Sequence, residues 1–165
     1  MKLTEFNTLH RPDAVAAIRP ALDVPRWLES VVDARPYAHH DGLLRTGRTA
    51  AEPFTAEEVE RALSHHPRIG ERARGGGAEA ALSQAEQSAV DPADDDVQAR
   101  LRAGNLAYEQ KFGRVFLIRA AGRSPEEILE ALCARMDHDP ATERRVVAEQ
   151  LRQIALLRLE GLVTP

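Results

Sequence analysis

Apolar residues recur every three or four positions along most of this chain, which is the spacing of one face of an α-helix. The longest periodic stripes predict helices at residues 55–66, 97–112, 125–136 and from about 142 to 162. Shorter stripes beside prolines or polar capping residues predict further helices at 4–9, 12–25, 25–36 and 43–49. The strongest start signals are Thr55 with Glu58 and Ser124 with Glu127, both of which have the spacing of a capping box.

One segment, near residues 115–121, departs from the helical pattern. It consists mostly of bulky apolar residues ending in small ones, as in an isolated strand. Nothing else in the chain alternates with period two, so we expect no sheet for it to join. We therefore predict an extended segment buried between helices. Its peptide groups then need helix caps, water or an amide-rich ligand as hydrogen-bond partners.

The pattern as a whole predicts an irregular all-α bundle of seven to nine helices. The chain has 165 residues, which is enough to bury one sizeable core. We therefore expect a single domain over residues 1–165.

Composition and charge exclude several classes of protein. Apolar residues make up 43% of the chain, the net charge is −4, and no run of eighteen apolar residues occurs. These values argue against a membrane span, a disordered chain and broad nucleic-acid binding. The lone Cys133 has no partner for an internal disulfide, and the first residues lack the apolar core of a signal peptide. We expect a cytoplasmic protein.

Residues 64–87 combine a titratable ring with a predicted helix start. Pro67 disfavours the α conformation in the residue before it, so the preceding helix should end at His66. After three glycines, Ser83 and Glu86 have capping-box spacing. An exposed imidazole and a helix N-terminus are both useful against an anionic substrate. A buried histidine bonded to a backbone carbonyl remains the alternative for His66.

Arg158 falls on the apolar stripe of the last predicted helix, in line with Ile154. A buried guanidinium without compensation is strongly destabilising, so an anionic group should meet it. Glu86 and a substrate carboxylate are the two candidates. The alternative is that the side chain extends along the apolar surface and keeps its charge in solvent.

Six segments in a fixed order make the chain resemble the 2-oxo-4-hydroxy-4-carboxy-5-ureidoimidazoline (OHCU) decarboxylase family of urate degradation. They are F-N-T-L at 6–9, H-P-R-I-G at 66–70, S-Q-A-E-Q at 83–87, N-L-A-Y-E-Q-K-F-G at 105–113, F-L-I-R-A-A-G-R-S at 116–124 and I-A-L-L-R-L at 154–159. The resemblance covers nearly the whole chain. It implies an all-α lyase, a homodimer without a cofactor or metal, that releases carbon dioxide from OHCU and forms (S)-allantoin.

The resemblance also implies roles for particular residues. It places catalytic groups at His66, Glu86 and Arg158. It places substrate contacts at Pro67, Ser83, Glu86, Gln87, the backbone of Ile118, and Arg158. Two departures from the family pattern are Arg68, where many members have aspartate, and Ser88-Ala89, where alanine and glycine are usual.

The chemistry of such a substrate fits this set of residues. Its carboxylate sits beside a ring C=N bond, which accepts the electron pair left by carbon dioxide, so no pyridoxal or thiamine is needed. His66 is suited to exchange protons near neutral pH. Arg158 is suited to orient oxygens with its fork of donors, and the amide and carboxylate side chains to hold the ureido group and the ring.

Two alternative functions would each account for single features of the sequence. A metal-dependent hydrolase would use His39, His40, His65, His66 or His138, but the chain has no H-x-x-x-H or H-E-x-x-H spacing. A non-catalytic helical interaction module would make Ser83 and Glu86 only a helix cap, and Arg158 only part of a core ion pair. That second reading leaves the six ordered segments unexplained.

Overall fold

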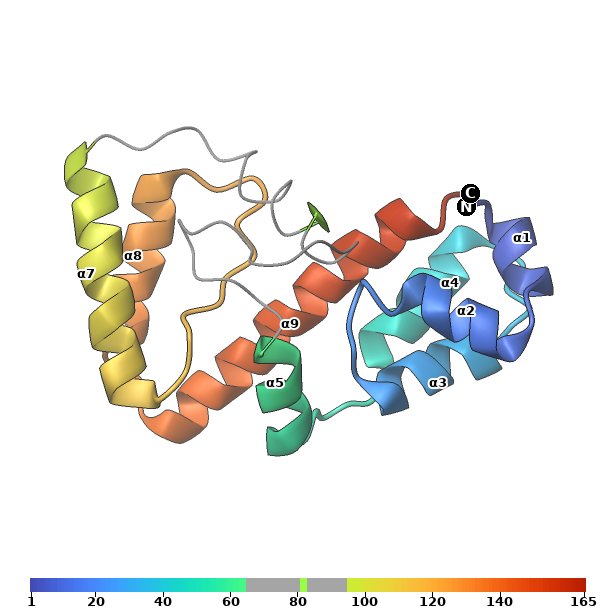
Figure 1. Ribbon diagram of the computed structural model, residues 1–165, viewed down its shortest axis with the longest axis horizontal. Coiled ribbons are helices and arrows are strands. Elements are labelled where there is room, and N and C mark those ends of the chain that lie inside the picture. The colour runs from blue at the N-terminus through green and yellow to red at the C-terminus, as the bar shows by residue number, and fades with distance from the viewer. Residues whose placement is uncertain (65–80, 83–94) are drawn as a thin grey trace. The chain divides into compact units, whose positions relative to one another are not determined.

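The structure is a computed structural model that describes residues 1–64, 81–82 and 95–165. The described residues form helices and no sheet, as Figure 1 shows. The eight helices named within them are α1 (Leu3–Thr8), α2 (Arg11–Ile18), α3 (Pro25–Asp33), α4 (His40–Thr49), α5 (Ala56–Leu63), α7 (Asp95–Phe112), α8 (Pro125–Arg135) and α9 (Pro140–Leu162). The predicted all-α fold of seven to nine helices is confirmed.

Both strong start signals form the expected caps. The Thr55 hydroxyl accepts from the Glu58 N–H at 3.2 Å, and the Glu58 carboxylate accepts from the Thr55 N–H at 2.7 Å. Ser124 and Glu127 make the same reciprocal pair, at 3.2 and 2.7 Å. Each pair satisfies two donors at a helix start, and this is why the sequence located α5 and α8 well.

Several predicted boundaries were wrong. α2 ends at Ile18 rather than near residue 25, because the proline at position 20 disfavours continuation of the helix. α1 begins after Lys2, so Thr4 is not its cap. α9 begins at Pro140 rather than 142, since the Asp139 carboxylate accepts from the backbone N–H groups of residues 141 and 142. Proline suits that first position, where an N–H has no helical partner.

The chain divides into two compact units. The first comprises Met1–Ala62 with Leu151–Pro165, and the second comprises Leu63–Gln150. α9 therefore contributes its residues up to Gln150 to the second unit and its remaining residues to the first. The prediction of a single domain stays a prediction.

The first unit packs α1–α5 with the end of α9. Its largest fully buried side chains include Phe6, Ile18, Leu22, Trp27, Leu28, Leu43, Leu151 and Leu159. The indole N–H of Trp27 donates to the Gly47 carbonyl at 2.8 Å. A Cβ on Gly47 would lie 3.0 Å from Leu159 Cδ2, so glycine allows α4 to approach α9 closely. The two ends of the chain lie together, since the Leu3 N–H donates to the Thr164 carbonyl at 2.8 Å.

The F-N-T-L segment has a structural role in this unit. The Asn7 amide donates to the Tyr37 carbonyl and accepts from the Tyr37 N–H, both at 2.9 Å. Both backbone groups of Tyr37 are thereby satisfied by one side chain, which holds the connection between α3 and α4 against α1.

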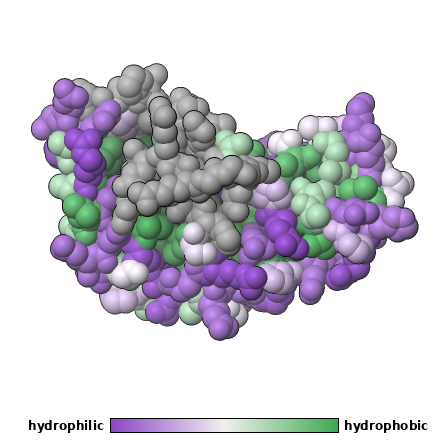
Figure 2. All heavy atoms as spheres, in the orientation of Figure 1, coloured by the Kyte–Doolittle hydropathy of each residue, from purple (hydrophilic) through white to green (hydrophobic). Residues whose placement is uncertain are grey.

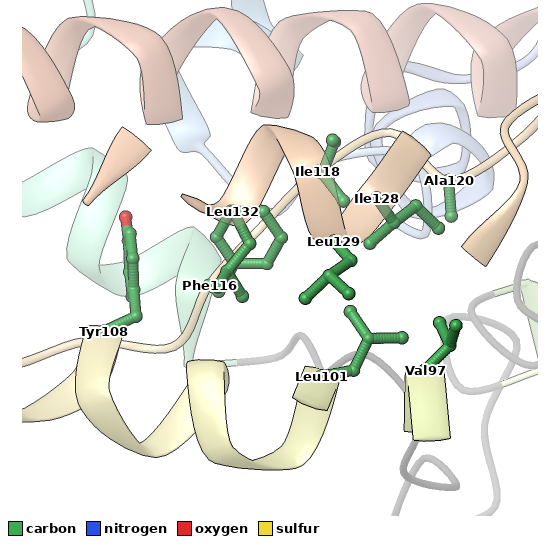
Figure 3. Close-up of a cluster of buried hydrophobic side chains, with 9 residues drawn as sticks. All are labelled: Val97, Leu101, Tyr108, Phe116, Ile118, Ala120, Ile128, Leu129 and Leu132. Carbon is green, nitrogen blue, oxygen red and sulfur yellow. The ribbon is translucent and has the colours of Figure 1, made fainter. Parts of the chain in front are cut away.

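The second unit is built on the pair α7 and α8, which run side by side in Figure 1. Between them lies a cluster of buried apolar side chains, drawn in Figure 3: Val97, Leu101, Tyr108, Phe116, Ile118, Ala120, Ile128, Leu129 and Leu132. Residues 115–120 contain no helix, and Phe116, Ile118 and Ala120 alternate along them in contributing to the cluster. That period of two is the side-chain pattern of an extended chain.

The surface is mixed in polarity. On the face drawn in Figure 2, hydrophilic residues are interspersed with smaller hydrophobic areas over the described atoms. Across residues 1–64, 81–82 and 95–165, no helix has the length and apolar character that crossing a membrane requires.

Candidate functional site

The structure describes two of the predicted site residues, Ile118 in the second unit and Arg158 in the first. The others, His66, Pro67, Ser83, Glu86 and Gln87, lie outside the described residues, as do His65, Arg68 and Ser88-Ala89. The predicted gathering of His66, Glu86 and Arg158 around one substrate therefore stays a prediction.

Arg158 is deeply buried on α9. Only 2% of the residue is exposed, and its neighbours Ala155 and Leu159 are fully buried. One guanidinium nitrogen, Nη1, donates to the Pro20 carbonyl at the long distance of 3.4 Å. The alternative in which the charge reaches solvent is thus wrong, and the core-facing position predicted from the apolar stripe is confirmed.

Ile118 is anchored by its side chain. It is 4% exposed and belongs to the apolar cluster between α7 and α8, where Figure 3 shows it with Ile128 and Ala120. The role that the family resemblance implies for Ile118 concerns its backbone, whose orientation is set by the two flanking peptide groups.

Two side chains hydrogen-bond the backbone on either side of Ile118. The Leu117 carbonyl accepts from Arg135 Nη1 at 2.7 Å, and the Arg119 N–H donates to Gln150 Oε1 at 2.9 Å. The sequence predicts caps, water or a ligand as partners for this segment, but these two groups have side-chain partners instead. Among the residues that the structure describes, none hydrogen-bonds to the N–H or the C=O of Ile118 itself.

Arg135 belongs to a buried polar network that the sequence analysis missed. Its Nε and Nη2 donate to Glu143 Oε1 at 2.9 and 2.5 Å, and its guanidinium carbon lies 4.5 Å from the centre of the Phe116 ring. The Tyr108 hydroxyl donates to the same carboxylate oxygen, and His138 Nδ1 lies 2.8 Å from the other oxygen. One buried carboxylate thus joins α7, α8 and α9.

The sequence contained a signal for this network. Arg135 follows Ile128 and Leu132 at helical spacing, and Glu143 precedes Val147 by four positions on the stripe of α9. Charged residues of opposite sign in line with two apolar stripes predict a buried pair. The prediction of a buried charge covered only Arg158.

Contacts within the network change the pKa values of Glu143 and Tyr108. Burial acts to raise the pKa of Glu143, but hydrogen bonds from Arg135 and Tyr108, with the charge of Arg135, outweigh it and lower the pKa. Burial, together with the hydrogen bond to Glu143, raises the pKa of Tyr108. Glu143 is thus held ionised and Tyr108 neutral, which suits a fixed structural role.

A second buried arginine on α9, Arg152, was also missed. Its Nη1 donates to the Arg48 and Ala50 carbonyls at 2.6 and 2.9 Å, and its guanidinium lies 4.3 Å from the Phe54 ring. These carbonyls lie at the C-terminal end of α4, where helical acceptors lack partners and a positive charge is favourable. Arg152 therefore caps α4.

The described histidines have local roles. His39 is the N-cap residue of α4, and His40 Nε2 lies 2.6 Å from the Val163 carbonyl oxygen. His138 contacts Glu143, as described above. Within the parts of the chain that the structure describes, no three His, Cys, Asp or Glu side chains form a group able to hold a metal ion.

Comparison with known proteins gives a consistent family. The sequence model of the family described as OHCU decarboxylase matches residues 7–160. The 2-oxo-4-hydroxy-4-carboxy-5-ureidoimidazoline decarboxylase of Haloferax volcanii is 29% identical over 161 residues, which cover 96% of this chain and 94% of the relative. The enzyme of that name from Amia calva is 27% identical over 166 residues, covering 99% and 95%.

Two solved structures share the fold. A crystal structure of an OHCU decarboxylase in the presence of (S)-allantoin superposes with a TM-score of 0.69 at 23% identity, over 86% of this chain and 93% of the other. A crystal structure of an (S)-allantoin synthase gives a TM-score of 0.72 at 16% identity, over 99% of this chain and 54% of the other.

Proposed function

Since this chain belongs to the OHCU decarboxylase family, we propose that it catalyses the cofactor-independent decarboxylation of OHCU to (S)-allantoin in urate degradation. The observation that carries the proposal is the family match over residues 7–160, with relatives that align along nearly their whole length. The matched region includes both Ile118 and the buried Arg158.

The reaction requires little beyond positioning and proton management. When the bond between the ring carbon and the carboxylate breaks, its electron pair flows into the adjacent C=N bond. Carbon dioxide leaves, the ring nitrogen of that bond takes up a proton, and an enol remains. The enol becomes a ketone when its hydroxyl gives up a proton and the neighbouring ureido-bearing carbon gains one. We assign proton exchange to His66, whose ordinary pKa of about 6.5 suits general acid–base work near neutral pH. Addition of the proton from a single face gives the (S) product.

Arg158 supplies a fixed cation for this substrate. A guanidinium offers a planar fork of donors to carboxylate or carbonyl oxygens, and its interaction with an anion is stronger where water is excluded. The burial of Arg158 supports this assignment. Glu86 and Gln87 would hold the ureido and ring amides, beside Pro67 and Ser83. The Ile118 N–H and C=O would also contact the substrate, since a donor and an acceptor together complement an amide-rich ligand.

The assignment of His66 is tested by His66→Asn. General acid–base catalysis contributes about a hundredfold or more, so we expect turnover to fall by at least about tenfold. Freshly prepared OHCU is added, and circular dichroism follows (S)-allantoin above a protein-free blank. His39→Asn is the matched control, because His39 is exposed and asparagine is a favourable N-cap. A smaller loss in His66→Asn contradicts the role, and a wild-type protein without activity contradicts the function.

The assignment of Arg158 is tested by Arg158→Lys. Lysine keeps the charge but loses the planar fork, so we expect kcat/KM to fall about tenfold or more while the protein stays folded. Arg144→Lys, at an exposed position on the same helix, is the control. Folding is followed by the fluorescence of Trp27, the chain's single tryptophan, which is fully buried in the first unit. Equal activities in the two variants would exclude Arg158 from the site.

The proposal includes a homodimer acting in the cytoplasm. The family resemblance supports the dimer, and the single Cys133 suits a reducing compartment. Analytical ultracentrifugation tests the dimer, since a mass near 18.2 kDa at micromolar concentration would contradict it.

A further inference from the structure

We infer that Gln150 is a positioning residue, which orients the peptide group between Ile118 and Arg119 so that the Ile118 carbonyl faces the substrate. This inference rests on the proposed function, in which the backbone of Ile118 contacts OHCU. It concerns a side chain that neither the family motifs above nor the predicted site includes.

The first support is the planarity of the peptide group. The peptides on both sides of Ile118 are trans, and in a trans peptide the N–H and the C=O point in opposite directions. The Arg119 N–H donates to Gln150 Oε1 at 2.9 Å. The Ile118 carbonyl, which belongs to the same peptide group, must therefore point away from Gln150.

The same argument applies one peptide earlier. The Leu117 carbonyl accepts from Arg135 at 2.7 Å, so the Ile118 N–H points away from Arg135. Each of the two peptide groups flanking Ile118 thus has one end fixed by a side chain. Their other ends, the Ile118 N–H and C=O, have no partner among the described residues.

Both side chains come from helices. Arg135 is fixed by the buried Glu143, and the backbone of Gln150 is fixed in the middle of the long helix α9. The Ile118 side chain is a third anchor, because it is buried in the cluster between α7 and α8. A segment held at three points presents its two remaining polar groups in one orientation, which is what a precise binding site requires.

A core with no ligand to bind would gain nothing from this arrangement. Backbone groups excluded from water are normally hydrogen-bonded. For stability alone, side chains that hydrogen-bond the N–H and C=O of Ile118 would serve as well as side chains that hydrogen-bond its neighbours. Orienting the groups outward from two satisfied peptides makes a donor and an acceptor available side by side. That pair matches the amide of a ureido group or an imidazoline ring.

The test uses two substitutions at position 150. Gln150→Met preserves length and removes the strong acceptor, whereas Gln150→Glu keeps an oxygen acceptor for the Arg119 N–H. Without the hydrogen bond that orients this peptide group, the affinity for the ligand should fall about three- to tenfold. We expect Gln150→Met to raise KM for OHCU, and the dissociation constant of (S)-allantoin, by that factor, with kcat within about twofold. Gln150→Glu should remain within about twofold of wild type in all three values.

This pattern separates positioning from structure. A purely structural role would lower the active fraction, so that kcat falls and KM stays unchanged. Gln110→Met makes the same substitution at an exposed position on α7 and should leave all three values unchanged. The dissociation constant is measured by isothermal titration calorimetry with (S)-allantoin as the probe.

The outcomes are distinguishable. If wild-type protein forms (S)-allantoin and Gln150→Met leaves KM unchanged, or Gln150→Glu loses as much as Gln150→Met, the inference fails while the proposed function stands. If Gln150→Met lowers kcat alone, the residue is structural and the inference fails again. If the wild-type protein forms no (S)-allantoin, both the proposed function and the inference are overturned.

Discussion

Glu143 is the residue on which the buried polar network of the second unit depends. Its carboxylate is 1% exposed and is shared by Arg135, Tyr108 and His138. Replacement by glutamine would leave the guanidinium of Arg135 without its counter-charge. We therefore expect Glu143→Gln to lower the free energy of unfolding by about 3 kcal/mol at pH 7, measured by urea denaturation. Glu130→Gln, at an exposed position on α8, should change it by less than about 0.5 kcal/mol.

The same pair of proteins gives a pH test. The folded pKa of Glu143 is lowered, so its stabilisation is present above the unfolded value of about 4.3 and is lost as pH falls through the folded pKa. The difference in unfolding free energy between wild type and Glu143→Gln should therefore be largest near pH 7 and should narrow below about pH 4. A difference that stays constant down to pH 3 would contradict the ionised state assigned to Glu143.

Single residues were predictable where one charge interrupted a long apolar stripe. Arg158 was found in this way and is buried as expected. Arg135 and Glu143 are also charged residues in line with apolar ones. Arg135 lies at the end of the apolar stripe of α8, and Glu143 lies at the start of the stripe of α9. Arg152 lies beside Leu151 rather than on that stripe. It falls in line with the buried Ala155 and Leu159, but only the fold brings the end of α4 to it. Its role follows from tertiary packing.

At the scale of elements, the contact between α7 and α8 depends on Gly104. A Cβ at this position would lie 2.4 Å from Leu132 Cδ2, and Leu132 is 1% exposed and has little room to move. We expect Gly104→Ala to lower the free energy of unfolding by about 1–3 kcal/mol, because overpacking outweighs the better helix propensity of alanine.

Gly161→Ala is the matched control for that substitution. Gly161 also lies within a helix, but nothing surrounds the position of its Cβ within 4 Å. At this position only the better helix propensity of alanine over glycine remains. The variant should therefore be as stable as wild type, or up to about 1 kcal/mol more stable by urea denaturation. If both substitutions stabilise the protein, the close contact at Gly104 is not significant.

Helix starts were predicted better than helix ends for a physical reason. A start is marked by side chains that bond the first N–H groups, so Thr55 and Ser124 were recognisable in the sequence. The end of α2 was misplaced because Leu22 continued the apolar spacing beyond the helix. Leu22 is indeed buried, but it lies in the connection that follows Pro20. The apolar pattern reported burial correctly there and secondary structure incorrectly.

At the scale of the whole molecule, the two compact units share one helix. α9 runs without interruption from Pro140 to Leu162, and the division falls between Gln150 and Leu151. Unfolding of one unit alone would end the helix in its middle. The sequence there has no proline or glycine to end a helix, and no capping side chain to bond the exposed backbone groups. We therefore propose that the units unfold together, as the single domain predicted from the sequence would.

Glu143→Gln tests this proposal from a distance. The substitution lies in the second unit, whereas Trp27 reports on the first. If the units unfold together, the urea midpoint followed by Trp27 fluorescence should shift downward as far as the midpoint followed by far-ultraviolet circular dichroism. If the fluorescence midpoint stays at its wild-type value while the dichroism midpoint falls, the two units unfold separately. The single domain would then be replaced by two, joined through α9.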